Sequence, residues 1–340
     1  MEAAVKSKKL ISIVLSSILL FGCIKVDTPK EDTPSDPPNI APITTFPETN
    51  KGCGEGCSSD CNLYVIGGNA ESSVLMSHDG VSWETIGNVP TKERGSSVVF
   101  NKKIFYIGGR NNVYSSSDGV TWVKQNGSPL PLRVWKVLVY NNRIWAIGGD
   151  DGTGTPVSSA YSSPDGSHWD VEANLPSIIN RFAAVVFQNK IFTYGAYNVY
   201  APVLKTIFSY DSKNLYWNIP GYLPTPYVDG SATTFNDKVY LIGGNGNVDP
   251  SFKADEVMSS SDGVSFQLES RIPNRTRHPI VTTFDGKLWV MGGRSMTSEE
   301  IFTQVYSSTD GKTWDFENTL PIGKVESGVV KYSQSCGSGE

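Results

Sequence analysis

The feature that most constrains this chain is a pattern repeated six times between residues 62 and 332. Each copy has an apolar run that ends in two small residues, followed by a polar turn and then Trp or Phe. The pairs of small residues are Gly67-Gly68, Gly108-Gly109, Gly148-Gly149, Gly195-Ala196, Gly243-Gly244 and Gly292-Gly293. They recur at intervals of 41, 40, 47, 48 and 49 residues, a period typical of β-propeller blades. So short a unit cannot bury both faces of its own sheet, so the copies must stack into one body.

Three features of the repeat predict its strands. An Asp-Gly pair precedes the aromatic residue in five copies, as in Asp118-Gly119 before Trp122, and predicts a two-residue primed turn between the third and fourth strands. The pair of small residues predicts the end of the second strand, where a side chain would obstruct close packing. The aromatic residue predicts packing between neighbouring sheets. We therefore expect an all-β, six-bladed propeller over residues 62–336.

The fourth copy identifies a family resemblance. Tyr210-Asp211 followed by Trp217, together with the glycine pairs, resembles the kelch repeat. The resemblance covers residues 62–332 and implies a kelch-like propeller, in which binding sites usually lie on one rim and at the mouth of the central channel. It is informative about fold and says little about function.

The same resemblance raises enzymatic possibilities. Galactose oxidase, a kelch relative, needs two His ligands and a Cys-linked Tyr around copper, but this chain has only three histidines and no Cys within the repeats. The polar turns also resemble the Asp-box of sialidases, from which they differ because no residue separates Asp from Gly. We therefore expect no cofactor and no metal, and we assign no catalytic residue.

The N-terminus predicts export. Three lysines precede an apolar run over residues 10–21, which is too short to span a bilayer and is typical of a secretory signal. The sequence Leu20-Phe21-Gly22-Cys23 resembles the lipobox of bacterial lipoproteins, which implies a signal peptide over residues 1–22 and lipid attachment at Cys23. An ordinary signal peptide with an incidental Cys is the alternative. Residues 23–51 are rich in Pro, Thr and acidic residues and predict a disordered tether.

The repeat also predicts how the ring closes. The first copy starts at its second strand, residues 62–66, whereas the last repeat is followed by a lone first strand, residues 327–332. We expect these two strands to pair in one sheet, because that pairing removes the exposed sheet edges.

Four cysteines remain besides the lipidated one, an even number in an exported protein. Cys61 precedes one closing strand and Cys336 follows the other, so we expect a disulfide between them. Cys53 and Cys57, in a Cys-rich segment over residues 52–61, would then pair locally. A zinc or iron–sulfur site with four thiolates is the alternative, which the Cys-x3-Cys-x3-Cys spacing does not favour.

The candidate site lies on the upper rim, where the glycine-pair loops and the starts of the innermost strands meet. Its predicted residues are Arg94, Arg110, Arg133, Trp135, Arg181, Arg277, His278 and Arg294. Guanidinium groups favour carboxylate or sulfate, so we expect an anionic ligand. The alternative is that each arginine pairs with a neighbouring carboxylate. Asp229 replaces the arginine in one copy and would make the site asymmetric.

Composition narrows the partners. The net charge is −5 and the pI is about 5.4, without a basic domain, which excludes nucleic acid as a partner. We expect a monomeric, lipid-anchored protein of the bacterial cell envelope, in the outer membrane, periplasmic or surface-exposed, that binds protein or glycan ligands. A sugar-acid epimerase of the sialic-acid type and a structural envelope component are the alternatives. Carboxylates near His278 would favour the enzyme, whereas aromatic exposure around Trp135 would favour binding.

Overall fold

The structure, a computed structural model, describes residues 61–108, 112–126, 130, 133–198, 204–245 and 254–333. All of them belong to one compact unit, Glu48–Glu340. The predicted signal peptide, the tether, Cys53, Cys57, Cys336 and Arg110 lie outside the described residues. The described part consists of strands and turns, and none of it forms a helix long and apolar enough to cross a membrane.

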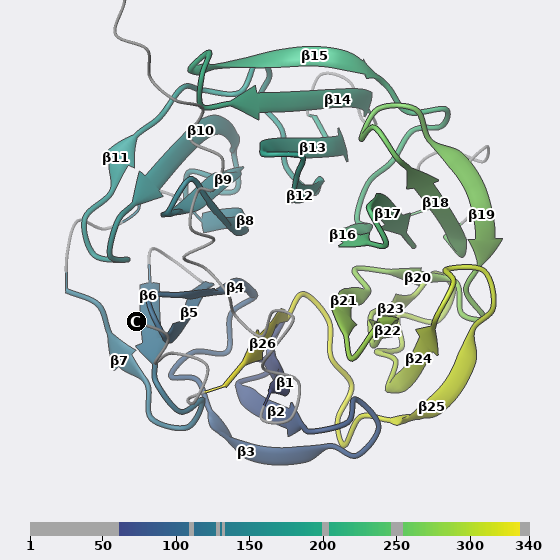
Figure 1. The fold of residues 1–340 in the computed structure, drawn as a ribbon. Helices are drawn as coiled ribbons and strands as arrows, with labels where there is room; N and C mark the ends of the chain where they lie inside the picture. The colour runs from purple at the N-terminus through teal and green to yellow at the C-terminus, as the bar shows by residue number, and fades with distance from the viewer. Residues whose placement is uncertain are drawn as a thin grey trace, which may run out of the picture. The chain divides into compact units, whose positions relative to one another are not determined.

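Six four-stranded antiparallel sheets stand around a central axis, which confirms the six-bladed propeller (Figure 1). The innermost strands of blades 1 to 6 are β26 (Gly328–Tyr332), β4 (Gly95–Phe100), β8 (Arg133–Tyr140), β12 (Ala183–Phe187), β16 (Ser231–Phe235) and β21 (Ile280–Phe284). The second strands are β1 (Asn62–Ile66), β5 (Lys103–Gly108), β9 (Arg143–Asp150), β13 (Lys190–Ala196), β17 (Lys238–Ile242) and β22 (Lys287–Met291).

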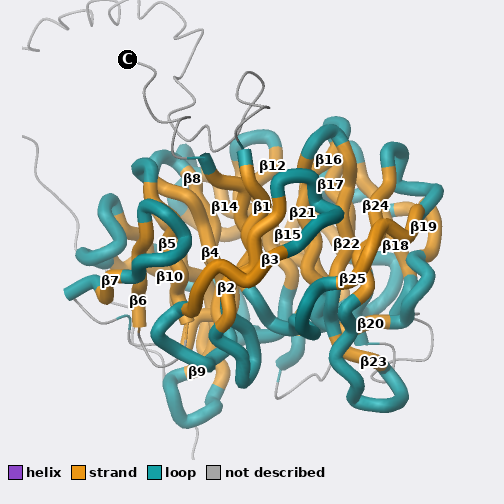
Figure 2. The backbone as a smooth tube through the Cα atoms, turned by 90° about the horizontal axis from the view of Figure 1, so that it is seen from below, coloured by secondary structure: helices purple, strands orange, loops and turns teal. Residues whose placement is uncertain are grey.

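The outer half of each blade completes its sheet. The third strands are β2 (Ser73–Ser77), β6 (Asn112–Ser116), β10 (Pro156–Ser163), β14 (Leu204–Asp211), β18 (Glu256–Ser260) and β24 (Gln304–Ser308). The outermost strands are β3 (Glu84–Asn88), β7 (Val123–Lys124), β11 (Asp170–Val171), β15 (Tyr216–Tyr222), β19 (Gln267–Arg271) and β25 (Asp315–Thr319). A separate two-stranded sheet joins β20 (Thr276–Arg277) to β23 (Arg294–Ser295). Seen from the side, the loops gather at the two ends of the strands (Figure 2).

Blade 1 closes the ring as predicted. β26 pairs with β1 in antiparallel register, with Asn62 opposite Tyr332 and Ile66 opposite Gly328. The first sheet therefore takes its innermost strand from the far end of the repeats, and β26 covers the inner edge that β1 would otherwise leave open.

The turns differ from the prediction in one respect. Two-residue turns with both residues at positive φ join the first and second strands, as at Asn101 (45°) and Lys102 (59°). These are the primed hairpins, because this geometry follows the twist of the strands. The prediction that the Asp-Gly pairs form such turns is wrong.

The Asp-Gly pairs lie in longer loops, such as residues 117–122 between β6 and β7. One oxygen of Asp118 accepts hydrogen bonds from the backbone N–H groups of Val120 (2.8 Å) and Thr121 (2.7 Å). Trp122 donates its indole N–H to the Gly119 carbonyl at 3.1 Å. The Asp therefore fixes the loop from within, and Trp122 lies in the loop rather than at the start of the strand.

The glycine pairs lie, as expected, where a side chain would clash with a neighbouring strand. Gly149 has φ +122°, and a Cβ atom at this position would lie 1.9 Å from the Arg133 carbonyl oxygen. Only glycine allows β9 to pass so close to β8 at this rim.

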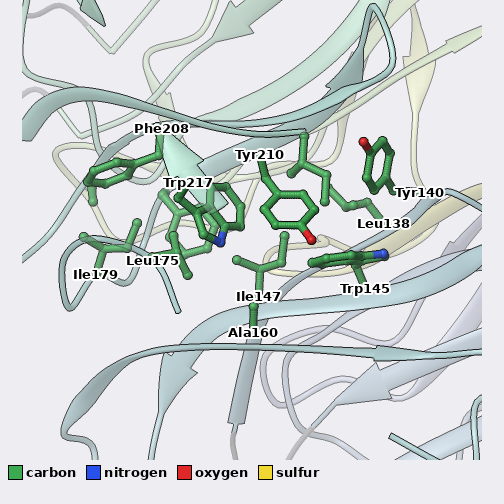
Figure 3. Packing of buried hydrophobic residues seen from close by; sticks show 13 residues of the cluster. Leu138, Tyr140, Trp145, Ile147, Ala160, Leu175, Ile179, Phe208, Tyr210 and Trp217 are labelled. Carbon is green, nitrogen blue, oxygen red and sulfur yellow. The ribbon is translucent and has the colours of Figure 1, made fainter. Parts of the chain in front are cut away.

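Six hydrophobic clusters fill the spaces between neighbouring blades, and in each the aromatic residue that follows the polar turn of one blade belongs to the cluster or packs against it. Figure 3 shows the cluster between blades 3 and 4, where Tyr210 and Trp217 face Tyr140 and Trp145. The rings of Trp145 and Tyr210 have centroids 4.8 Å apart. The prediction that the aromatic residues pack between sheets is confirmed.

Candidate functional site

A pocket lies where the innermost strands of five blades begin. Its walls are Arg94, Gly95, Ser96, Val134, Trp135, Lys136, Gly230, Ser231, His278, Pro279, Ile280, Glu326 and Ser327. We call it the axial pocket. It holds about 560 Å³ of empty space, a volume that includes the open solvent at its mouth.

One position recurs in every blade, six residues before the last aromatic residue of the innermost strand. The residues at this position, the strand-start ring, are Glu326, Arg94, Val134, Arg181, Asp229 and His278. Glu326, Arg94, Val134 and His278 line the pocket. Arg181, Asp229, His278 and Glu326 all have φ between 53° and 60°, a left-handed conformation that is costly for residues other than glycine.

Backbone hydrogen bonds between blades offset that cost. The N–H of Asp229 donates to the Arg181 carbonyl at 3.0 Å, and the N–H of His278 donates to the Asp229 carbonyl at 2.6 Å. Gly95, next to Arg94, donates to the Glu326 carbonyl at 3.3 Å. The hydrogen bonds hold three pairs of neighbouring blades in register around the axis, so the ring side chains have fixed relative positions.

Asp229 is the most buried charge of the ring, with a side chain that has no exposed surface. Arg181 forms a two-point pair with it, with a distance of 2.6 Å from Nε to Oδ1 and a second bond from Nη2 to Oδ2. Asn245 donates to Oδ2 at 3.2 Å. Burial alone would raise the pKa of Asp229, but His278, Arg181 and Asn245 hold it below its usual value. Asp229 is therefore a fixed negative charge beneath the pocket.

His278 lies between two carboxylates. Its Nε2 atom is 3.4 Å from Asp229 Oδ1 and 3.6 Å from Glu326 Oε1. Burial lowers the pKa of His278, a shift that the two carboxylates oppose and that Arg181 and Lys136 increase. The imidazole of His278 is therefore neutral at pH 7 and is able to accept a proton.

Trp135 forms the aromatic wall. Its indole N–H donates to the Phe182 carbonyl at 3.0 Å, which fixes the ring across the boundary between blades 3 and 4. The guanidinium carbon of Arg94 lies 5.1 Å from the centre of the Trp135 ring, and the His278 ring lies 6.1 Å from it. A flat apolar surface thus borders a cation and an imidazole.

The predicted site residues divide into three groups. Arg94, Trp135 and His278 line the axial pocket. Arg133 and Arg181 lie beside it and pair with Asp150 and Asp229. The structure does not bring Arg277 and Arg294 to the pocket: both pair with Glu299, outside the pocket wall.

Carboxylates accompany all the predicted arginines that the structure describes. Arg94 itself lies 3.6 Å from both Asp150 and Glu326. The arrangement therefore agrees with the alternative that each arginine pairs with a neighbouring acid, and among the described arginines only Arg94 lines the axial pocket. Arg94 keeps a side chain that is 40% exposed and separations longer than tight hydrogen bonds, so it can still meet a ligand.

The sequence patterns do not single out Lys136 and Glu326 as pocket residues, and they give Asp229 only as the residue that replaces an arginine in one copy. Alignment of the copies on Phe100, Phe187 and their equivalents would have placed Arg94, Arg181, Asp229, His278 and Glu326 in one column. Arg133 and Arg277 fall one residue before that column, and their side chains take other partners.

Two further observations bear on the predicted chemistry. The described residues contain no group of three or more His, Cys, Asp or Glu arranged to hold a metal ion. At the other rim, Lys103 and Lys190 are exposed, while Lys238 and Lys287 pair with Glu269 (3.3 Å) and Glu317 (3.0 Å).

Fold and pocket together define a six-bladed β-propeller with a charged pocket on its axis. No family model matches the chain, and no curated protein matches it. Among solved structures it is similar to one described as "Structure of YjhT", with a TM-score of 0.59 and 14% identity over 71% of this chain and 88% of that one. At this identity the likeness supports the fold alone.

Proposed function

We propose that the protein is an exported binding module whose axial pocket takes a negatively charged sugar unit of a glycan. The observation that carries this proposal is the set of side chains that line one pocket: the Trp135 ring, the two cations Arg94 and Lys136, and serine hydroxyl groups. An aromatic face packs against the C–H side of a sugar, and serine hydroxyls and charged groups meet its polar edge. A pocket of this shape suits a sugar better than the flat surface of a protein.

The charge of the pocket supports an anion. Arg94 and Lys136 stand against one acid in the wall, Glu326, while His278 is neutral. The wall therefore carries a formal net charge of about +1, although the whole chain carries −5.

A matched pair of ligands tests the proposal. Titration calorimetry compares methyl β-glucuronide with methyl β-glucoside, which differ only in the carboxylate and have no free carbonyl. We expect the glucuronide to bind more tightly, and Trp135→Ala to weaken its binding by about tenfold to a hundredfold. Lys103→Ala, an exposed change at the other rim, is the control. Equal affinity for both ligands would contradict the preference for an anionic sugar. Unchanged affinity in Trp135→Ala would contradict binding in the axial pocket.

A sugar-acid epimerase is the second candidate, favoured by the two carboxylates beside His278. A neutral imidazole held between acids can remove a proton next to a sugar carboxylate. Exchange of the C5 proton of glucuronate in heavy water, followed by proton NMR, tests this activity. Exchange that disappears in His278→Asn would establish it, and no exchange above the rate without protein leaves binding as the function.

We also propose that the propeller is of the kelch type and that the protein carries a lipid anchor. The six copies, the glycine pairs and the Tyr210 to Trp217 segment support a kelch propeller. Leu20 to Cys23 supports a lipoprotein of the bacterial envelope. Cell fractionation of Cys23→Ser tests the anchor: the variant should leave the membrane fraction, and unchanged retention would contradict lipid attachment at this residue.

A further inference from the structure

Lysines that burial affects differ in what their amino groups contact. Burial lowers the pKa of Lys136, Lys324 and Lys331. Lys324 is fully buried and donates to the carbonyl oxygens of Gly67 (3.1 Å) and Ser73 (2.7 Å) and to the Ser73 hydroxyl (2.7 Å). Lys331 donates to Thr283 Oγ1 at 3.5 Å. Both amino groups therefore already donate hydrogen bonds within the protein.

Lys136 is different because it lines the axial pocket. Within the described residues its amino group has neither a hydrogen bond nor an ion pair, and it interacts with Glu326 and Asp229 only over a longer range. Once the group is neutral, no described residue donates a hydrogen bond to its Nζ lone pair. A ligand in the pocket would meet it directly.

The surroundings of Lys136 raise the fraction of its amino group that is neutral. Burial lowers its pKa, and the charges of Glu326 and Asp229 only partly oppose that shift. His278, which also lines the pocket, is a neutral base able to exchange protons with pocket contents. An amine in such surroundings is a nucleophile toward carbonyl carbon.

We propose that Lys136 forms an imine with a small aldehyde or ketone that carries a carboxylate, with the carboxylate held by Arg94. The inference rests on the proposed function in that it uses the axial pocket as a ligand site, and it adds a covalent step to it. Arg94 is the cation suited to the carboxylate, since its guanidinium group borders the Trp135 wall and is partly exposed.

The step balances without a further reactant. The Nζ lone pair attacks the carbonyl carbon, the C=O π electrons move to oxygen, and that oxygen takes a proton from solvent water. The attacking nitrogen then loses one of its two protons to His278, which passes it to the hydroxyl group. Water leaves, and a protonated C=N bond, in which nitrogen keeps its second proton, replaces the C=O bond; its positive charge matches the hydroxide ion left in the solvent. No electrons are gained or lost, and hydrolysis reverses the reaction.

Reductive trapping tests the step on the full-length protein. Glyoxylate and sodium cyanoborohydride at pH 7 would convert an imine at Lys136 into a carboxymethylated lysine, which peptide mass spectrometry locates. We expect Lys136 to be labelled faster than exposed Lys103, because a lowered pKa raises the fraction of the amino group that is neutral. Lys324 should stay unlabelled because it is sealed in the fold. The comparison is made within wild type and does not depend on a variant that folds.

Matched reagents and variants separate the parts of the inference. Glycolaldehyde, which replaces the carboxylate of glyoxylate by a hydroxymethyl group, should label Lys136 more slowly. Arg94→Gln should remove that difference, and Lys136→Arg should remove the label. Equal labelling of Lys136 and Lys103 would contradict imine formation at a reactive Lys136. Equal labelling of Lys136 by both reagents would contradict recognition of the ligand's carboxylate. Calorimetry with methyl β-glucuronide needs no imine, so the proposed binding function stands or falls separately.

Discussion

The Nε2 atom of His278 lies 3.4 Å from Oδ1 of Asp229, a carboxylate with no exposed surface. A second carboxylate, Glu326, lies 3.6 Å from the same nitrogen. Two acids would ordinarily raise the pKa of an imidazole, yet burial outweighs them and lowers it. The exposed His168 has the reverse balance, because its hydrogen bond to Asp165 raises its pKa.

The two histidines should therefore titrate on opposite sides of the usual value. Proton NMR of the ring signals should give a midpoint for His278 below about 6.5 and one for His168 above it. His278→Asn and His168→Asn assign the signals. Asn is suited to position 278 because it tolerates the left-handed φ found there. A midpoint for His278 above that of His168 would contradict the burial argument.

The same burial predicts how stability depends on pH. A histidine whose pKa is lowered in the folded state binds fewer protons there than in the unfolded chain. Its contribution is therefore complete above about pH 6.5 and is lost as the pH falls toward the folded pKa. Urea unfolding of wild type between pH 7.5 and 5 should show this loss, and His278→Asn should show less of it. Equal slopes would mean that His278 is not the group responsible.

Lys324 should contribute strongly to ring closure. It lies just before β26 in the sequence and donates to Gly67 and Ser73, which belong to the part of blade 1 around β1 and β2. Lys324→Met leaves two buried carbonyl oxygens without this donor and should lower the free energy of unfolding by about 2–4 kcal/mol. Urea unfolding measures this change, with exposed Lys312→Met as the control. A loss of unfolding free energy no larger than that of Lys312→Met would contradict a role of Lys324 in stabilising the ring closure.

Gly149 should not tolerate a side chain. In Gly149→Ala the new Cβ meets the Arg133 carbonyl at a distance that no packing adjustment of side chains relieves, and the positive φ adds strain. We expect a loss of more than about 3 kcal/mol in unfolding free energy. Gly87→Ala is the matched change, since its Cβ would find its nearest atoms at 3.6 Å, and it should stay within about 0.5 kcal/mol of wild type. Similar losses in both would refute the steric explanation.

Cys61 should be joined to Cys336. Cys61 is buried directly before β1, the strand that pairs with β26, and its sulfur is held in a disulfide. Cys336 lies outside the described residues, so the identity of the partner stays a prediction. Peptide mapping without reduction should recover the two cysteines in one cross-linked species. Recovery of Cys61 with Cys53 or Cys57 would assign the pairing differently.

Sequence patterns predict the fold of this protein better than its site. The blades follow from local periodicity, since the glycine pairs and the aromatic residues act in the same way in every copy. The pocket depends on loops of unequal length, in which a shift of one residue decides the partner of a side chain. Arg181 pairs beneath the pocket with Asp229, whereas Arg277 turns to Glu299, although both arginines precede an innermost strand.

The turns fail for a related reason. Asp-Gly is a strong signal for a two-residue hairpin, but here Asp118 captures two backbone N–H groups further along and lengthens the loop. Asn101-Lys102 carries the weaker signal and forms the hairpin, because the register of Phe100 opposite Lys103 leaves room for two residues only. Tertiary register decides between turn types that local sequence leaves open.

Closure by β26 also sets the order in which a newly made chain can finish folding. β1 leaves the ribosome long before residues 328–332, so during synthesis its inner edge carries N–H and C=O groups that no strand satisfies. A product of interrupted translation would keep that edge open and present it to proteases and to other nascent chains. Completion of the ring therefore distinguishes a chain translated past residue 332 from one that stops before β26.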